Sequence, residues 1–355
     1  MSESFQKLYM RKDIPDHAFL LEEGKVFFYL NNTDKYMITG KSLIVGATEL
    51  IMKYISGEKI EREETAITTS SSKLKNIPIE KFKEGLKSFS FLMNTSSVLA
   101  KQVKLTNNII NQSIAQLEGD EQKLKEISIE YFMILDRISR EYQKRKIPWL
   151  MTILNEGKLN LCYKRGEAYY KSTIPTKLHE GVQLSARMVE YPVGSILCEQ
   201  DSDGTEMYVL QSGIIDVHVD KNRIASITEP GTITGEMALL LGEKRTATLV
   251  AKNNVVINKI SKEDLKNISA RDLSLMQTIL ETLARRHYYN IVKIEDMTEK
   301  IAMRTLQGTG QEDKLELRLE QTLDNLHELQ NKVSKFCREK KQDFLDDLIR
   351  GFRKK

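Results

Sequence analysis

The residues whose types and spacing could bind a ligand lie in a short segment that begins at Gly235. Glycine can adopt the positive φ angle that a tight turn into a helix needs. Glu236, Met237 and Ala238 would then form the first turn, whose free backbone N–H groups favour an anion. Arg245 can complete this anion site with a planar guanidinium that is always charged. The carboxylate of Glu236 beside an anion suits a ligand that also carries a hydroxyl, as a sugar does.

This segment resembles the phosphate-binding cassette of cyclic nucleotide-binding domains, the family of the catabolite activator protein and of the regulatory subunits of cyclic nucleotide-dependent kinases. The resemblance covers about residues 180–295. It implies that Glu236 accepts a hydrogen bond from the ribose 2′-hydroxyl, that the amides next to it hold the phosphate, and that Arg245 pairs with the phosphate charge. The expected ligand is cyclic AMP or cyclic GMP. The upstream segments that share the resemblance are Tyr191–Leu197, Gln200–Gly204 and Met207–Val217.

Two further parts of the chain complete the implied site. By the resemblance, Thr246 can offer a hydroxyl to the 2-amino group of guanine, although threonine also suits the start of a strand and occurs in members that prefer cyclic AMP. Ala247 follows at the family's spacing. The helix expected over residues 273–297 would fold over the ligand, with Tyr288 or Tyr289 stacking on the base. The alternative is that one tyrosine belongs to the core and the other to the surface.

Residues 1–115 look like a worn copy of the segment that carries the cassette. Laying Thr65 over the threonine that follows the cassette arginine places Glu64 on that arginine and Glu49 near the cassette glutamate. A carboxylate in the arginine position would repel a phosphate. Arg62 lies nearby, but a shifted guanidinium would lose the bidentate geometry. We therefore expect the first copy to be structural or to serve as an interaction surface.

The fold class expected from these patterns is α+β. It comprises two jelly-roll barrels of the cyclic nucleotide-binding kind with flanking helices, a helical linker between them and a C-terminal amphipathic helix. The expected domains are a degenerate barrel at 1–75, the helical linker at 76–180, the ligand-binding domain with its helices at 181–297, and the C-terminal helix at 298–355.

Length and composition indicate how many domains, which partners and which cellular location to expect. A chain of 355 residues suits two or three domains, and a net charge of +4 favours neither nucleic acid nor a membrane as partner. The three cysteines lack metal-ligand spacing, which indicates reduced thiols and no metal. No stretch has the length and apolar character of a signal core or a membrane-spanning helix. We expect a cytoplasmic protein.

The C-terminal part narrows the function. Apolar residues follow an a/d pattern across 312–340, which fits either a homodimer or packing against the body of the chain. No short turn divides this segment into a helix-turn-helix, which disfavours DNA binding. No nucleophile and base or Walker-type loop points to an enzyme. The sequence thus favours a sensor that signals to a protein effector, over a transcriptional regulator or a scaffold without ligand.

Overall fold

The structure is a computed structural model, and it describes residues 4–56, 60–116, 120–172, 176–178, 187–307 and 312–339. Contacts between residues divide the chain into two compact units, each made of two segments of sequence. The first unit consists of Met1–Thr106 with Ile174–Tyr288, and the second of Asn107–Thr173 with Tyr289–Lys355. Two long helices, α3 (Phe89–Gln116) and α9 (Ser274–Gln307), contribute residues to both units. The α9 helix therefore continues past residue 297, where its end was expected.

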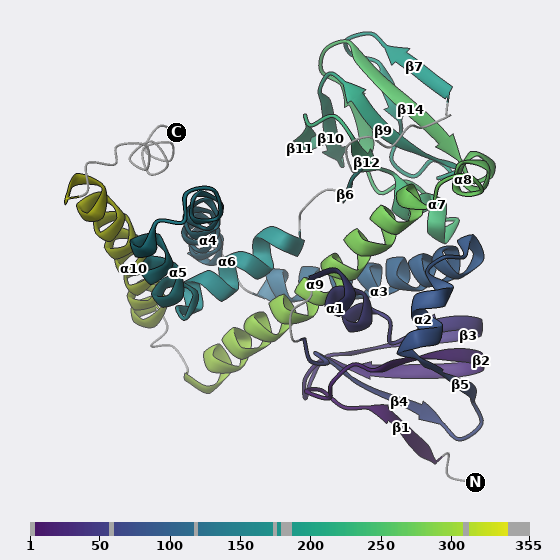
Figure 1. Ribbon diagram of the computed structural model, residues 1–355, viewed down its shortest axis with the longest axis horizontal. Coiled ribbons are helices and arrows are strands. Elements are labelled where there is room, and N and C mark those ends of the chain that lie inside the picture. Colours follow the sequence, from purple (N-terminus) through teal and green to yellow (C-terminus); the bar gives the residue numbers. More distant parts are fainter. Residues whose placement is uncertain are drawn as a thin grey trace. The chain divides into compact units, whose positions relative to one another are not determined.

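The N-terminal part of the first unit is a five-stranded antiparallel sheet with the order β1-β4-β2-β3, in which β5 also pairs with β2 (Figure 1). Alternate residues of β2, such as Val26 and Phe28, are buried, which is the period of two that a half-buried strand shows. Helices α1 and α2 follow β3 and β5. The bounds are β1 (Phe5–Tyr9), β2 (His17–Tyr29), β3 (Lys35–Val45), α1 (Thr48–Ser56), β4 (Thr65–Thr69), β5 (Lys73–Pro78) and α2 (Ile79–Gly85).

The rest of the first unit, here called the second domain, contains two antiparallel sheets, with the orders β11-β10-β13-β8 and β6-β12-β9-β14-β7. Ser261 and Asp264 form a capping box that begins the helix after the last strand. The bounds are β6 (Thr176–Lys177), β7 (Arg187–Tyr191), β8 (Ile196–Cys198), β9 (Glu206–Ser212), β10 (Ile215–Val219), β11 (Asn222–Ile227), β12 (Thr232–Thr234), α7 (Glu236–Leu241), β13 (Thr248–Ala251), β14 (Val255–Ser261) and α8 (Lys262–Ser269).

The N-terminal sheet repeats the strand register of the second domain. Val26 lies opposite Thr68 on β4, and Ile215 lies opposite Ala251 on β13. The pair β2 with β5 likewise repeats β9 with β14, and β1 with β4 repeats β8 with β13. The two parts also differ: β2 runs unbroken, whereas its counterpart is interrupted at Gly213 (φ +97°) between β9 and β10. The described N-terminal strands therefore form one sheet and not a closed barrel.

The largest core of the first unit joins the N-terminal sheet to the second domain. It contains Leu99 and Val103 of α3, Ile279 and Leu283 of α9, and Leu240 of α7, all buried. Figure 1 shows α3 and α9 between the N-terminal sheet and the sheets of the second domain. Burial of apolar side chains is the dominant favourable term in folding, so this core holds the two parts of the unit together.

The second unit is helical and includes residues 107–173 of the predicted linker, whereas residues 76–106 belong to the first unit. Helices α4 (Asp120–Arg145), α5 (Pro148–Lys158) and α6 (Leu161–Ser172) pack with α10 (Glu312–Glu339). The apolar stripe predicted for a homodimer or for packing is buried within the chain, at Leu326, Leu329 and Val333. Packing against the body is therefore the alternative that the structure shows, because these side chains already contact α4 and α5. Residues 340–355 of the predicted C-terminal helix lie outside the described residues.

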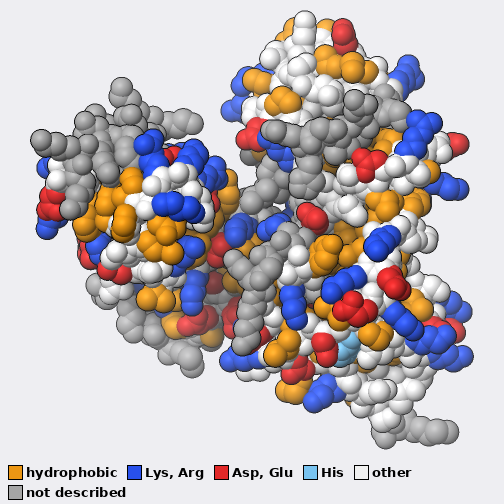
Figure 2. Space-filling view, viewed as in Figure 1, with side chains coloured by type: hydrophobic (Ala, Val, Ile, Leu, Met, Phe, Trp, Pro, Cys, Tyr) orange, Lys and Arg blue, Asp and Glu red, His pale blue; other side chains and the backbone are white. Residues whose placement is uncertain are grey.

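Two features of the described residues concern a membrane or a metal ion as partner. In those ranges, no helix has the length and hydropathy needed to span a membrane. The same residues offer no group of three His, Cys, Asp or Glu side chains suited to a metal ion. Figure 2 shows basic and acidic side chains interspersed over the visible face.

Candidate functional site

The segment predicted to bind a ligand forms a compact loop in the second domain. Gly235 precedes α7 with φ +79°, in the left-handed region that favours glycine. A Cβ atom at this position would lie 2.4 Å from Nη1 of Arg245. Glycine therefore suits the backbone angle, and an added Cβ would displace the guanidinium from its present position. The side chains of Glu236 and Ala238 in the first turn of α7 are buried.

Arg245 is buried, with 5% of its surface exposed. Its Nη1 donates to the carbonyl of Gly235 (3.2 Å), and its Nη2 donates to the carbonyl of Glu206 (2.5 Å) and to the hydroxyl of Tyr208 (3.3 Å). Within the described part of the chain, no carboxylate forms an ion pair with it, and its Nε is buried without a hydrogen bond. The site thus holds a buried cation whose Nε–H group is still able to donate a hydrogen bond.

Glu236 lies in contact with an arginine of α9, a pairing that the sequence analysis did not predict. Nη1 of Arg286 in α9 is 2.8 Å from Oε1 of Glu236. The two residues are 50 positions apart in sequence, so no local spacing predicts their contact. Both predicted base caps have other partners: Tyr288 donates to Glu63 (3.1 Å), and Tyr289 accepts from Lys171 (3.0 Å). Arg286 of α9 thus contacts the loop through an ion pair.

The remaining predicted site residues border the loop. Met237 is partly buried and packs against the core of the first unit. The side chain of Thr246 is exposed, whereas Ala247 is partly buried. The structure therefore brings Gly235, Glu236 and Arg245 together at one place, with Thr246 exposed beside Arg245.

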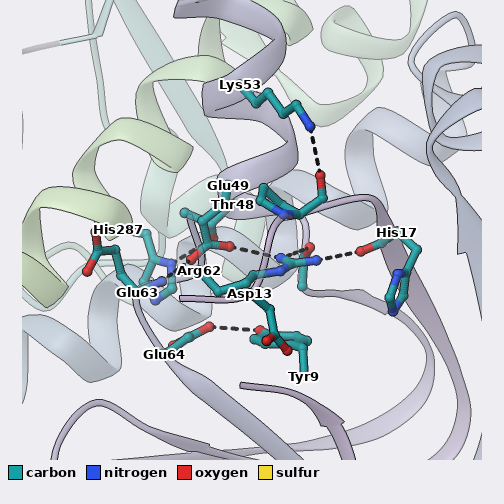
Figure 3. Close-up of polar contacts among 12 residues, drawn as sticks. Tyr9, Asp13, His17, Thr48, Glu49, Lys53, Arg62, Glu63, Glu64 and His287 are labelled. Carbon is teal, nitrogen blue, oxygen red and sulfur yellow. Dashed lines mark hydrogen bonds and ion pairs between the residues drawn. The ribbon is translucent and has the colours of Figure 1, made fainter. Parts of the chain in front are cut away.

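The N-terminal sheet holds a second arginine in the same setting, shown in Figure 3. Nη1 of Arg62 donates to the carbonyl of Gly46 (2.7 Å), whose φ is +73°, and Nη2 donates to the carbonyl of His17 (2.5 Å). His17 begins β2 opposite the last residue of β5, as Glu206 begins β9 opposite the last residue of β14. Arg62 thus takes the position of the cassette arginine, and the expectation that Glu64 lies there is wrong.

The error is a slip of two residues. Strand side chains alternate with a period of two, so a slip of this size leaves the pattern of buried and exposed positions unchanged. The loop before β4 is also longer than the loop before β13. Alternation along the sequence therefore could not have corrected the alignment.

The charge of Arg62, unlike that of Arg245, is neutralised inside the chain. Oε2 of Glu49 lies 2.9 Å from Nη1 of Arg62, and the two side chains are 0% and 1% exposed. Glu49 was expected near the position of the cassette glutamate. That glutamate directly follows Gly235, whereas Glu49 lies three residues after Gly46, in α1, and pairs with Arg62 (Figure 3). The residue after Gly46 is Ala47, so the N-terminal copy has no carboxylate in the place of Glu236.

A buried polar network adjoins this ion pair. Glu64 accepts from the hydroxyls of Tyr9 (3.1 Å) and Tyr36 (2.7 Å). Burial, together with the nearby charge of Glu49, raises the pKa of Glu64 to about 8. His287 of α9 completes the network, and burial lowers the pKa of its imidazole to about 3, so the ring is neutral.

Comparison with known proteins bears on the second domain. The family model described as the cyclic nucleotide-binding domain matches residues 188–272. The cAMP-dependent protein kinase regulatory subunit of Candida albicans is 28% identical over 105 residues, a match that covers 30% of this chain and 21% of that protein.

Two solved structures are also similar to parts of this chain. The N-terminal domain of a transcriptional regulator from Streptomyces coelicolor is 25% identical and covers 29% of this chain and 76% of its own, with a TM-score of 0.26. The regulatory domain of Toxoplasma gondii PKA with cAMP is 13% identical and covers 75% of this chain and 78% of its own, with a TM-score of 0.22.

Proposed function

Because residues 188–272 form a cyclic nucleotide-binding domain, we propose that this chain is a sensor of cyclic AMP or cyclic GMP. The ligand binds at the loop that contains Gly235, Glu236 and Arg245. The observation that carries the proposal is the buried guanidinium of Arg245, which has no carboxylate partner in the described chain. A buried charge is costly unless it is paired, and the cyclic phosphate would supply the missing anion.

Glu236 and Arg286 support the sugar half of this assignment. Arg286 neutralises the carboxylate, so Glu236 does not repel a phosphate bound beside it. Arg286 donates to Oε1 of Glu236, and a carboxylate offers about four acceptor positions. Oε2 therefore remains suited to accept from the ribose 2′-hydroxyl.

The N-terminal sheet is, in this proposal, a worn copy of the second domain that binds no nucleotide. The repeated strand register supports a duplication, because register is set independently for each strand pair. Glu49 already supplies the anion that Arg62 needs. A phosphate entering there would have to displace a buried carboxylate.

The signal leaves the loop through α9. This helix contacts Glu236 through Arg286, so its position and the occupancy of the loop are linked. Ligand shifts the population toward the arrangement that it binds more tightly, by no more than its difference in affinity for the two states. The chain then acts as a regulatory protein on a protein effector rather than as an enzyme. A transcriptional regulator and a scaffold without ligand remain the alternatives.

The test is calorimetric titration of the full chain with cyclic AMP and cyclic GMP in separate experiments. We expect saturable binding near one site per chain, and the two affinities will show which nucleotide the site prefers. Arg245→Ala should weaken binding by about 2 to 5 kcal/mol, the usual cost of removing one partner of a desolvated charge pair. Arg223→Ala serves as the control, because it removes an exposed arginine of the same domain, whose guanidinium lies 3.7 Å from the carboxylate of Asp216. Absence of binding by the wild-type chain would favour the scaffold.

A further inference from the structure

Three consecutive residues of α9 contact both parts of the first unit. Arg286 pairs with Glu236 of the second domain at 2.8 Å. His287 and Tyr288 contact the N-terminal part, where Tyr288 donates to Glu63 at 3.1 Å. An α-helix is stiff over so short a span because its backbone hydrogen bonds close every turn. Any movement of His287 therefore moves Arg286 with it.

His287 is buried in the N-terminal part, and both nitrogens of its ring contact hydroxyl groups there. The imidazole is 0% exposed, and both ring nitrogens have partners: Nδ1 lies 2.8 Å from the hydroxyl of Thr48, and Nε2 lies 2.9 Å from the hydroxyl of Tyr36. A neutral imidazole donates through one nitrogen and accepts through the other, and hydroxyls serve either role. The amide of Gln102 and the carboxyl of Glu64 hold the hydroxyl of Tyr36 in place at 2.8 and 2.7 Å.

This site occupies the part of the N-terminal copy that corresponds to the cassette. Thr48 lies two residues after Gly46, as Met237 lies two residues after Gly235. The first turn that would face a phosphate in the second domain thus faces an imidazole in the N-terminal copy. With Glu49 on Arg62 and His287 on Thr48, side chains of the chain itself fill this region.

Helix α3 of the N-terminal part makes the reciprocal contact, with the second domain. Lys104 pairs with Glu243 at 2.6 Å, and Ser97 donates to the carbonyl of Leu240 at 3.4 Å, both next to the ligand-binding loop. Each of the two long helices therefore contacts the cassette region of the part to which it does not belong by sequence. Helix α3 thus contacts the C-terminal end of α7, and helix α9 contacts its N-terminal end through Arg286.

We propose that the N-terminal part is the binding site for helix α9, and that by holding His287 and Tyr288 it keeps Arg286 on Glu236 and raises the affinity of the loop for its nucleotide. This inference rests on the proposed function and specifies how the same site is regulated. If the held arrangement is the binding-competent one, the apparent affinity scales with the fraction of molecules that adopt it. Loss of the hold lowers that fraction.

The test removes the hydroxyls that bind His287 without changing the size of the side chains. The variant is Tyr36→Phe combined with Thr48→Val in the full chain. Tyr288→Phe is the second variant, in case loss of both buried hydroxyls prevents folding. Tyr29→Phe is the matched control, because Tyr29 lies in the same sheet with its ring beside the amine of Lys35. Hydrogen exchange without ligand is measured across 280–290 and 235–246, and nucleotide affinity by calorimetry.

We expect the variants to exchange faster than the control in both segments and to bind the nucleotide about tenfold more weakly, within the usual range of coupling between sites. Unchanged exchange across 280–290 would show that the N-terminal part does not hold α9. Faster exchange there with unchanged exchange across 235–246, or with equal or tighter nucleotide binding, would show that the hold does not support the loop. If the wild-type chain binds neither nucleotide, the proposed function fails, and the two exchange measurements still decide whether the N-terminal part holds α9 and stabilises the loop.

Discussion

The ion pair between Glu49 and Arg62 allows a sharp test of why the two arginines differ. The change is Glu49→Gln, which keeps the size of the side chain and the acceptor oxygen for the backbone N–H of Glu63, now 3.3 Å from Oε1. What it removes is the negative charge 2.9 Å from Arg62. Both side chains are essentially inaccessible to water, so no solvent can take the place of that charge.

The expected cost follows from this geometry. Removing one partner of a buried ion pair costs about 3 to 5 kcal/mol, because the other charge stays buried without compensation. Arg62 keeps its hydrogen bonds to the carbonyls of Gly46 and His17, which partly compensate the charge. We therefore expect the lower end, about 3 kcal/mol, or roughly a 100-fold increase in opening of the N-terminal sheet.

The assay is native-state hydrogen exchange at the backbone amides of β2 and β4, which reports opening of this part of the chain alone. Glu80→Gln is the control: its exposed pair with Lys83 (3.3 Å) should be worth no more than about 1 kcal/mol. If Glu49→Gln lowers the opening free energy by no more than the control does, the charge of Arg62 does not depend on Glu49. The contrast drawn with Arg245 would then be unfounded.

Gly235→Ala should weaken nucleotide binding, measured by titration, because the new Cβ would lie 2.4 Å from Nη1 of Arg245; wild-type affinity would show that the guanidinium can move freely. Burial and the charge of Glu49 raise the pKa of Glu64 to about 8, so stability should fall as the pH rises from the ordinary value near 4.5 to about 8. Glu64→Gln should reduce that slope in urea unfolding, and an unchanged slope would count against the assignment. Burial, first, and nearby lysine charges lower the pKa of Lys293 to about 8, so its protonated form destabilises the fold fully below that pH. Lys293→Met should therefore raise the unfolding temperature at pH 7, and a lower temperature would show that the ammonium is stabilising.

The residues that form the loop could be predicted from sequence because they lie close together along the chain. Gly235, Glu236 and Arg245 lie within one turn, one short helix and one connection, so their spacing in sequence is close to their spacing in space. The structure adds that the glycine also makes room for the guanidinium. Helices and strands followed from periodicity for the same reason.

Contacts between segments that are far apart in the chain could not be predicted from the sequence. A slip of two residues preserves strand alternation, so Glu64 was assigned to the position that Arg62 takes. Arg286 and His287 face opposite parts of the first unit, a choice that depends on how α9 crosses them. Helical periodicity marks a face of a helix but does not specify what that face meets.

The C-terminal stripe shows the same limit. Its a/d pattern was compatible with a second chain or with the chain's own helices, because either would bury the same apolar side chains. The structure buries Leu326 and Val333 against α4 and α5. The sequence by itself thus determined the local chemistry of the loop and the amphipathic faces of the helices. Tertiary structure alone decided which buried charge is left without a partner, since Glu49 reaches Arg62 and no carboxylate of the described chain reaches Arg245.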